Sequence, residues 1–106
     1  MKVVNRIKKS EDFALPINKG HFYRLPSFKV FINKTDNNYV RIGLSVSSKL
    51  GCAVVRNRIK RQVRAMCDSL VDYQSKSQDV VIIVKSDFLE KTFNDNKSQL
   101  GDLFKN

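Results

Sequence analysis

The run Val80 to Val84 constrains the fold more than any other segment. It consists of five apolar β-branched residues, VVIIV, without a polar interruption. β-branched residues favour strands, and a strand that is apolar at every position is typical of one buried on both faces. We therefore expect a sheet with packed elements on both sides.

Two more strands are predicted by alternation of apolar and polar residues. Residues 27–33 place Phe28, Val30 and Ile32 on one face, and residues 39–47 repeat the pattern. A period of two is typical of strands with one buried face. Between them lies Thr35-Asp36-Asn37-Asn38, which has the composition of a turn, so the two strands are predicted to form a hairpin.

Three helices complete the prediction. The first begins at Ser10 as a cap and ends before Gly20, with Pro16 making it short or kinked. The second runs from about Val54 to about Tyr73. A third begins near Asp87, and its apolar stripe is expected to comprise Leu89, Phe93, Leu100 and Phe104. We expect one α+β domain, residues 1–106, with a single mixed β-sheet, about three helices and a strand-helix-strand crossover.

The charge of the chain points to an anionic partner. The net charge is +10, and residues 1–67 hold 15 basic and 3 acidic residues. Positive charges in such excess repel one another in a compact protein, and a polyanion is the usual binding partner of such a protein. The candidates are a nucleic acid, an anionic membrane surface or an acidic protein. No apolar run is long enough for a bilayer, and the first residues lack a secretory signal, so we expect a cytoplasmic protein that does not bind membranes.

The second predicted helix concentrates the positive charge. Its apolar positions fall on one arc: Val55, Ile59, Val63, Met66 and Leu70. The basic positions lie opposite or on the edges of this arc: Arg56, Arg58, Lys60, Arg61 and Arg64. A solvated helix face usually mixes both signs, and cations near a helix N-terminus oppose its dipole. Phosphate binding therefore explains the pattern better than solvation does, with Asn57 as a directional partner.

The outward face of the predicted hairpin is a second candidate surface. It carries Lys29, Phe31, Arg41, Gly43 and Ser45. An aromatic between cations suits a platform for single-stranded nucleic acid, and Phe13 and Ile17 of the first helix could form a wall of the groove. The alternative is that Phe13, Ile17 and Phe31 simply pack together beneath that helix. Periodicity does not separate the two interpretations.

The chain does not look like a nuclease by itself. His21 is its only histidine, its carboxylates are scattered apart from the neighbours Glu11 and Asp12, and it has no glycine-rich phosphate loop. We expect no catalytic side chain and no metal site in this chain. The two cysteines, Cys52 and Cys67, are expected to be reduced thiols without a special role.

The run RIGLSVSSKLGCAVVRNRIKRQVRA, with NRIKKSEDF upstream, resembles the protein subunit of bacterial ribonuclease P. The similarity reaches from the start to about Val84. It implies a subunit that assists a catalytic RNA in removing the 5′ leader of precursor tRNA, with Mg²⁺ held mainly by the RNA and none by the protein alone. It also implies a left-handed β-α-β crossover. Against the family pattern, Ile17 replaces an aromatic and Cys52 replaces an asparagine.

The resemblance assigns residues to two RNA sites. The catalytic RNA would contact Lys49, Arg56, Asn57, Arg58, Lys60, Arg61 and Arg64. The leader cleft would use Phe13, Ile17 and Phe31, to which the alternation adds Lys29, Arg41 and Ser45. The alternatives are a ribosomal or ribosome-assembly protein without nuclease role, and a DNA-binding regulator, although the second helix of a helix-turn-helix is missing.

Overall fold

A computed structural model describes residues 2–8 and 10–105 of the chain. The helices are α1 (Ser10–Lys19), α2 (Ala53–Leu70) and α3 (Phe93–Phe104), and the strands are β1 (His21–Arg24), β2 (Phe28–Lys34), β3 (Val40–Val46) and β4 (Gln78–Val84). Short 3-10 helices lie at η1 (Val3–Asn5), η2 (Ser48–Leu50) and η3 (Ser86–Glu90). None of the helices in these residues is long and apolar enough to cross a membrane.

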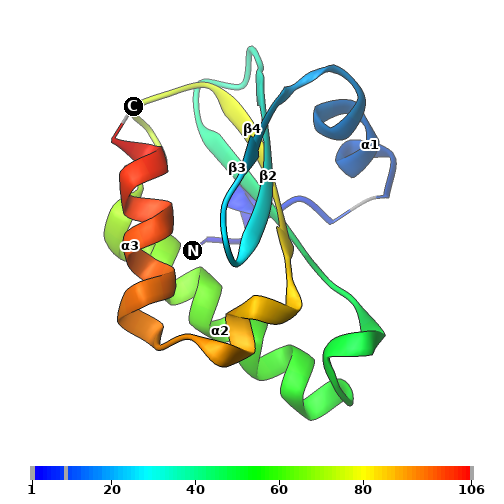
Figure 1. The fold of residues 1–106 in the computed structure, drawn as a ribbon. Helices are drawn as coiled ribbons and strands as arrows, with labels where there is room; N and C mark the ends of the chain where they lie inside the picture. Colours follow the sequence, from blue (N-terminus) through cyan, green and yellow to red (C-terminus); the bar gives the residue numbers. More distant parts are fainter. Residues whose placement is uncertain (1, 9, 106) are drawn as a thin grey trace.

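The four strands form one mixed sheet in the order β1-β2-β4-β3. Strand β4 pairs antiparallel with β2 and parallel with β3, and α2 connects β3 to β4. This confirms the predicted α+β class and the strand-helix-strand crossover; the left hand of the crossover stays a prediction. In Figure 1, α1 lies on one side of the sheet and α2 and α3 lie on the other.

The predicted hairpin between residues 27–33 and 39–47 is wrong. Both strands are present, but the apolar strand β4 lies between them and pairs with each. The physical reason is the composition of β4, because a strand apolar on both faces is best buried in the sheet interior. The hairpin in the structure joins β1 to β2, and its turn is closed by the Leu25 amide donating to the Phe28 carbonyl at 2.8 Å.

The main core lies between the sheet and the helices α2 and α3. Its fully buried members come from all these elements: Phe28, Val30, Ile42, Ile59, Val63, Met66, Val80, Ile82 and Leu100. Of the predicted arc of α2, Ile59, Val63 and Met66 are buried, while Val55 and Leu70 are half-buried at its ends. The 3.6-residue period therefore predicted correctly which face of α2 is turned to the sheet.

The helix ends differ from the predictions. Helix α2 ends at Leu70, because the backbone of Val71 is already extended. Residues 86–90 form the 3-10 helix η3 around buried Phe88, and α3 begins only at Phe93, with the Thr92 side chain accepting a hydrogen bond from the Asp95 amide. Leu89 and Phe93 are exposed, so their predicted place in the core stripe is wrong. Helix α1 keeps its predicted bounds with Pro16 inside, although Ser10 is its first residue rather than its cap.

Helix α1 packs on the other face of the sheet through a close contact between Phe13 and Gly43. A Cβ atom placed on Gly43 would lie 2.6 Å from Cε1 and 2.7 Å from Cζ of the Phe13 ring. No side chain larger than hydrogen fits there unless the ring moves. The glycine thus sets how closely α1 approaches the sheet.

Gly43→Ala is expected to lower the free energy of unfolding by roughly 1 to 3 kcal/mol, the usual cost of overpacking. The matched control is Gly101→Ala in α3, where the added Cβ would meet only Leu70 Cδ2, at 3.4 Å. That change is expected to be neutral or to stabilise by up to about 1 kcal/mol, because alanine favours helices. Urea unfolding of both variants measures the difference, and equal stabilities would show that Phe13 is free to move.

Candidate nucleic-acid interface

The first candidate surface is the outer face of α2. The apolar side chains of this helix hold it against the sheet and α3, so its basic side chains are turned to the outside. Lys49, Asn57, Arg58 and Arg61 are exposed, and Arg56, Lys60 and Arg64 are half-buried. The structure thus places all seven predicted RNA-subunit residues on α2 or on the turn η2 that leads into it.

These cations are not neutralised by nearby carboxylates of the described residues. The two ion pairs that join described residues both use Arg41, which lies on β3. The Nε atom of Arg56 is buried and has no hydrogen-bond partner within the described part of the chain. A buried donor without a partner costs free energy, so the described residues alone do not satisfy this nitrogen.

Arg6 was not predicted as part of this surface. Residues 6 and 7 run beside β3, with the Ile7 amide donating to the Ile42 carbonyl at 3.0 Å. The pKa of Arg64 is lowered, first by burial and then by the positive charge of Arg6. Sequence spacing could not have shown this interaction, because the two residues are 58 positions apart.

The N-terminus of α2 carries an exposed thiol. Cys52 occupies the cap position, and its side chain accepts no cap hydrogen bond of the standard kind. Backbone amides of Val55 and Val54 nevertheless lower the pKa of the thiol. Cys67 differs, because burial raises the pKa of its thiol to about 12. The α2 cap is thus weak, as expected for a cysteine in place of asparagine.

The second candidate surface is the sheet face that carries α1. The strand register arranges its side chains in two rows across all four strands. The first row runs Gly43, Val81, Phe31, Phe22, and the second runs Ser45, Ile83, Lys29, Arg24. Lys29, Phe31 and Ser45 therefore share a face, as predicted. Val81 and Ile83 also lie on this face but were not predicted as part of the surface. The run VVIIV is apolar at every position, which already implied that some of its side chains would point to this side.

A cleft lies between α1 and this sheet face. Its volume is about 410 Å³. It is lined by Lys8, Ser10, Phe13, Ile17, Leu44, Ser45, Val81 and Ile83. Phe13 and Ile17 form its helical wall, and with Ser45 they are the three of the six predicted leader-cleft residues that line it. Phe13 packs on the sheet at Gly43 and also lines the cleft, and its contact with a leader stays a prediction.

Arg41 is bound within the protein rather than free in the cleft. Its Nε and Nη2 atoms donate to the two carboxylate oxygens of Asp79 at 2.8 and 2.6 Å, and its Nη1 lies 3.7 Å from Asp12 of α1. The hydrogen bond to Asp79 is the main reason why the pKa of Arg41 is raised. The side chain of Asp79 is only 3% exposed, against 22% for Arg41. This network ties α1 to the centre of the sheet.

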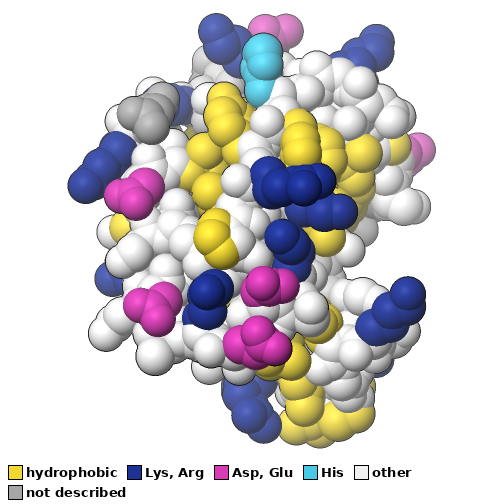
Figure 2. Space-filling model, in the orientation of Figure 1, with side chains coloured by type: hydrophobic (Ala, Val, Ile, Leu, Met, Phe, Trp, Pro, Cys, Tyr) yellow, Lys and Arg dark blue, Asp and Glu magenta, His cyan; other side chains and the backbone are white. Residues whose placement is uncertain are grey.

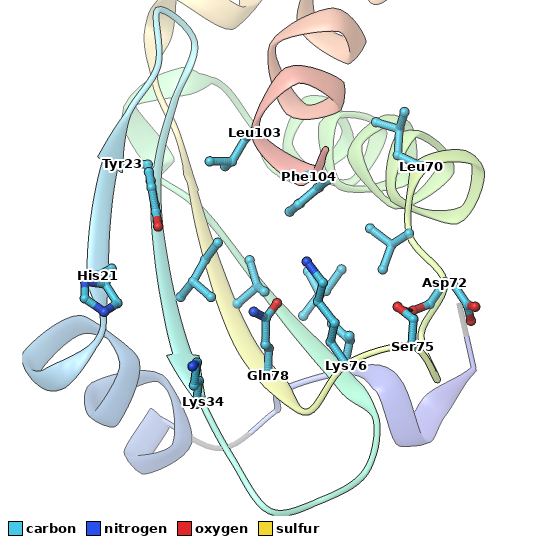
Figure 3. Close-up of a pocket in the computed structure, with 15 residues that line it drawn as sticks. His21, Tyr23, Lys34, Leu70, Asp72, Ser75, Lys76, Gln78, Leu103 and Phe104 are labelled. Carbon is cyan, nitrogen blue, oxygen red and sulfur yellow. Dashed lines mark hydrogen bonds between the residues drawn. The ribbon is translucent and has the colours of Figure 1, made fainter. Parts of the chain in front are cut away.

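A cavity with a volume of about 560 Å³ lies on the opposite sheet face. Figure 3 shows His21 and Tyr23 of β1 at one side of it and Leu103 and Phe104 of α3 at another. Its floor is apolar and comes from Ile32, Ile42 and Val80. Successive side chains of a strand point to opposite faces of the sheet. Since His21 and Tyr23 lie on this face, Phe22 and Arg24 lie on the face that carries α1.

The described residues do not offer a donor set that fits a metal ion. Within residues 2–8 and 10–105 no three His, Cys, Asp or Glu side chains come together. Asp12 of α1 and Asp79 of β4 both face Arg41. Divalent cations such as Mg²⁺ need several oxygen ligands, and these two are already engaged by a cation.

Comparisons with known proteins find relatives that match nearly the whole chain. The family model "Ribonuclease P" matches residues 1–106. The ribonuclease P protein component of Bacillus cereus is 42% identical over 99% of this chain and 92% of its own length, and that of Mesoplasma florum is 39% identical over 97% and 94%. Among solved structures, a Staphylococcus aureus RNase P protein mutant with defective mRNA degradation activity superimposes with a TM-score of 0.84 at 31% identity, covering 96% and 86% of the two chains. The RNase P protein from Thermotoga maritima gives 0.80 at 28% identity, covering 94% of each.

Proposed function

Because the chain belongs to the family of bacterial ribonuclease P protein components, which serves the processing of tRNA 5′ ends, we propose that its two faces bind two different RNAs. The family name implies an RNA partner in the holoenzyme. In our proposal this partner is the catalytic RNA, and the basic face of α2 binds it. The cleft under α1 binds the 5′ leader of precursor tRNA.

The single observation that carries this proposal is the unpaired basic face of α2. Its arginines project from a helix that is fixed by a packed core, and the ion pairs between described residues leave them free. Arginine suits phosphate because its planar fork makes two parallel hydrogen bonds. We include Arg6 with the seven predicted residues, because its positive charge acts on Arg64.

The cleft and the sheet face beside it carry the apolar and cationic groups that bind single-stranded RNA. Its wall and floor are apolar, through Phe13, Ile17, Val81 and Ile83, and Lys29 and Phe31 continue the sheet face beside it. Unpaired bases stack on aromatic and apolar groups, while cations follow the backbone. Ser45 adds a hydroxyl at the cleft floor. For Arg41 we propose a positioning role rather than contact with the leader, because two carboxylates already hold it.

The chemistry itself belongs to the RNA in this proposal. Hydrolysis of the phosphodiester needs an activated water and charge neutralisation, and Mg²⁺ held mainly by the RNA supplies both when bound. The side chains of this chain bind and orient the two RNAs and take no part in bond breaking.

Reconstitution tests the proposal. Purified chain, precursor tRNA and Mg²⁺ are expected to give no cleavage, and addition of a bacterial ribonuclease P RNA is expected to release the leader at the mature 5′ end. Gel analysis of end-labelled substrate shows both results, with mature tRNA as the control for nonspecific cutting. Robust cleavage by the chain without RNA would refute the division of roles.

Phe31→Ala is expected to weaken binding of leader-bearing substrate far more than binding of mature tRNA. About 1 to 3 kcal/mol is at stake if a base stacks on the ring. Equilibrium binding to the reconstituted holoenzyme measures both substrates. If affinity for both falls equally, the effect comes from a distorted fold, since Phe31 is half-buried beside β4.

A further inference from the structure

Strand β1 adds an aromatic and a cation to the sheet face that carries the cleft. Phe22 pairs with Phe31 and Arg24 pairs with Lys29 in the register of β1 and β2. Both rows of side chains on this face therefore end on β1. In Figure 2, Lys and Arg side chains lie against hydrophobic ones in the middle of the view, over the sheet.

Phe22 is exposed in a way that core packing does not explain. It is 46% exposed, although it is one of the largest apolar residues in the chain. Its ring centroid lies 5.0 Å from that of Phe31, with an angle of 31° between the rings. The pair is in contact, as aromatic side chains prefer, and still leaves an open aromatic surface on the outside of the hairpin.

The other aromatic on this face has less free surface. The ring of Phe13 is pressed onto Gly43 and forms the helical wall of the cleft together with aliphatic Ile17. Phe22 is thus the exposed aromatic side chain among the three, since Phe13 and Phe31 are both half-buried. Arg24 is exposed beside them, and the ion pairs between residues that the structure describes do not involve Arg24 or Lys29.

We propose that Phe22 and Arg24 extend the leader-binding surface across the sheet to its β1 edge, where an unpaired leader base stacks on Phe22 and its phosphate binds Arg24 and Lys29. This inference rests on the proposed function of the cleft. From Ser45 to Arg24 the surface crosses three interstrand steps of roughly 4.8 Å, about 14 Å in all. A single strand leaving the cleft thus meets aromatic and cationic groups on β2 and β1, the second half of this path.

Phe22→Ala and Tyr23→Ala form a matched pair for the test. The two residues are neighbours in β1 and are 46% and 40% exposed, but Tyr23 lines the cavity on the opposite face, as Figure 3 shows. The holoenzyme is reconstituted with each variant, and its affinity is measured for precursor tRNAs with a graded series of leader lengths. Phe22→Ala is expected to lose roughly 5- to 150-fold in affinity, the range for loss of one stacked base, and only with longer leaders. Tyr23→Ala is expected to bind all of them like the unaltered chain.

Two further variants test the chemistry of the contact. Phe22→Trp is expected to retain affinity for long leaders because it keeps a π-face, whereas Phe22→Leu, which is apolar without one, is expected to lose it. Arg24→Ala is expected to lower the slope of log affinity against log salt by about 0.7, the value for one phosphate contact in a single strand. If Phe22→Ala does not fold, Arg24→Ala with Arg24→Lys as its rescue carries the test.

Three outcomes would overturn the inference: full affinity in Phe22→Leu, equal losses in Phe22→Ala and Tyr23→Ala, or a loss that is the same for every leader length. Failure of the proposed function has a different signature, because the unaltered holoenzyme would then show no preference for leader-bearing substrate at all. Thermal unfolding of each variant separates a lost contact from a lost fold.

Discussion

Replacing Arg58 and Arg61 together by alanine is expected to weaken binding of the catalytic RNA by roughly tenfold to a hundredfold per arginine. Both side chains are exposed on α2, and each hydrogen bond to a charged group contributes about 1.5 to 3 kcal/mol. The slope of log affinity against log salt is expected to fall by up to about 0.9 per lost phosphate contact, hence by up to about 1.8 for the pair. Filter binding over a range of KCl concentrations measures both quantities.

The control for this prediction removes the same charge elsewhere. Lys76 lies in the loop before β4 and Lys91 lies between η3 and α3, and both are exposed. Lys76→Ala with Lys91→Ala is expected to change the salt slope much less, since neither residue is on α2. Folding is expected to be unaffected in both double variants, because exposed side chains away from the core contribute little to stability. Equal slopes of log affinity against log salt in the two double variants would show that Arg58 and Arg61 do not bind phosphates and only face the solvent.

The basic face of α2 was predictable because it follows from local geometry alone. A helix of fixed period turns Ile59, Val63 and Met66 inward, and the arginines between them must then face outward. No partner element has to be known for this step. The same holds for β2 and β3, where alternation predicted the correct inward residues.

The order of strands was not predictable by the same argument. Alternation assigns the faces of a strand but not its neighbours, and a turn between two strands favours the simplest pairing. The information was nevertheless present in Val80 to Val84. A strand that is apolar on both faces gains most from the sheet interior, and this preference separates β2 from β3.

Strand β1 was missed because its sequence, His21 to Arg24, does not alternate between apolar and polar residues. All four residues are also exposed in the structure. It is a strand only because β2 offers a free edge and the turn at Pro26 brings it there. The turn is in addition fixed to α3, since the Ser27 hydroxyl donates to Asn96 at 2.6 Å across 69 residues of sequence. Contacts of this range depend on the complete fold.

The start of α3 shows two capping signals in competition. Asp87 with Glu90 has the spacing of a capping box, and Thr92 with Asp95 has it as well. The later one caps α3, because Phe88 is buried edge-to-face against Phe28, with 5.7 Å between the ring centroids, and holds residues 86–90 in a separate 3-10 helix. Tertiary packing thus decided between two local signals of similar strength.

Asp79→Ala is expected to be among the most destabilising single changes in the chain, lowering the free energy of unfolding by roughly 2 to 4 kcal/mol. Asp79 is almost fully buried and holds Arg41 through two short hydrogen bonds, a geometry that is among the strongest for charged groups. Its removal leaves a half-buried guanidinium group whose remaining ion-pair partner among the described residues is Asp12, at 3.7 Å. The loss stays below the about 5 kcal/mol reached in fully buried pairs, because Arg41 keeps some contact with solvent.

The double variant Arg41→Met with Asp79→Val is expected to recover most of this stability, because removing both charges also removes the cost of burying one without its partner. The same variant separates the two possible roles of Arg41. If Arg41 positions α1 and does not bind the leader, a stable double variant in the holoenzyme keeps nearly the affinity of the unaltered protein for leader-bearing tRNA. If the double variant is stable but no longer prefers leader-bearing over mature tRNA, Arg41 contacts the leader after all. The two readouts, urea unfolding and substrate binding, are independent, so a charge that supports the fold is distinguished from a charge that contacts RNA.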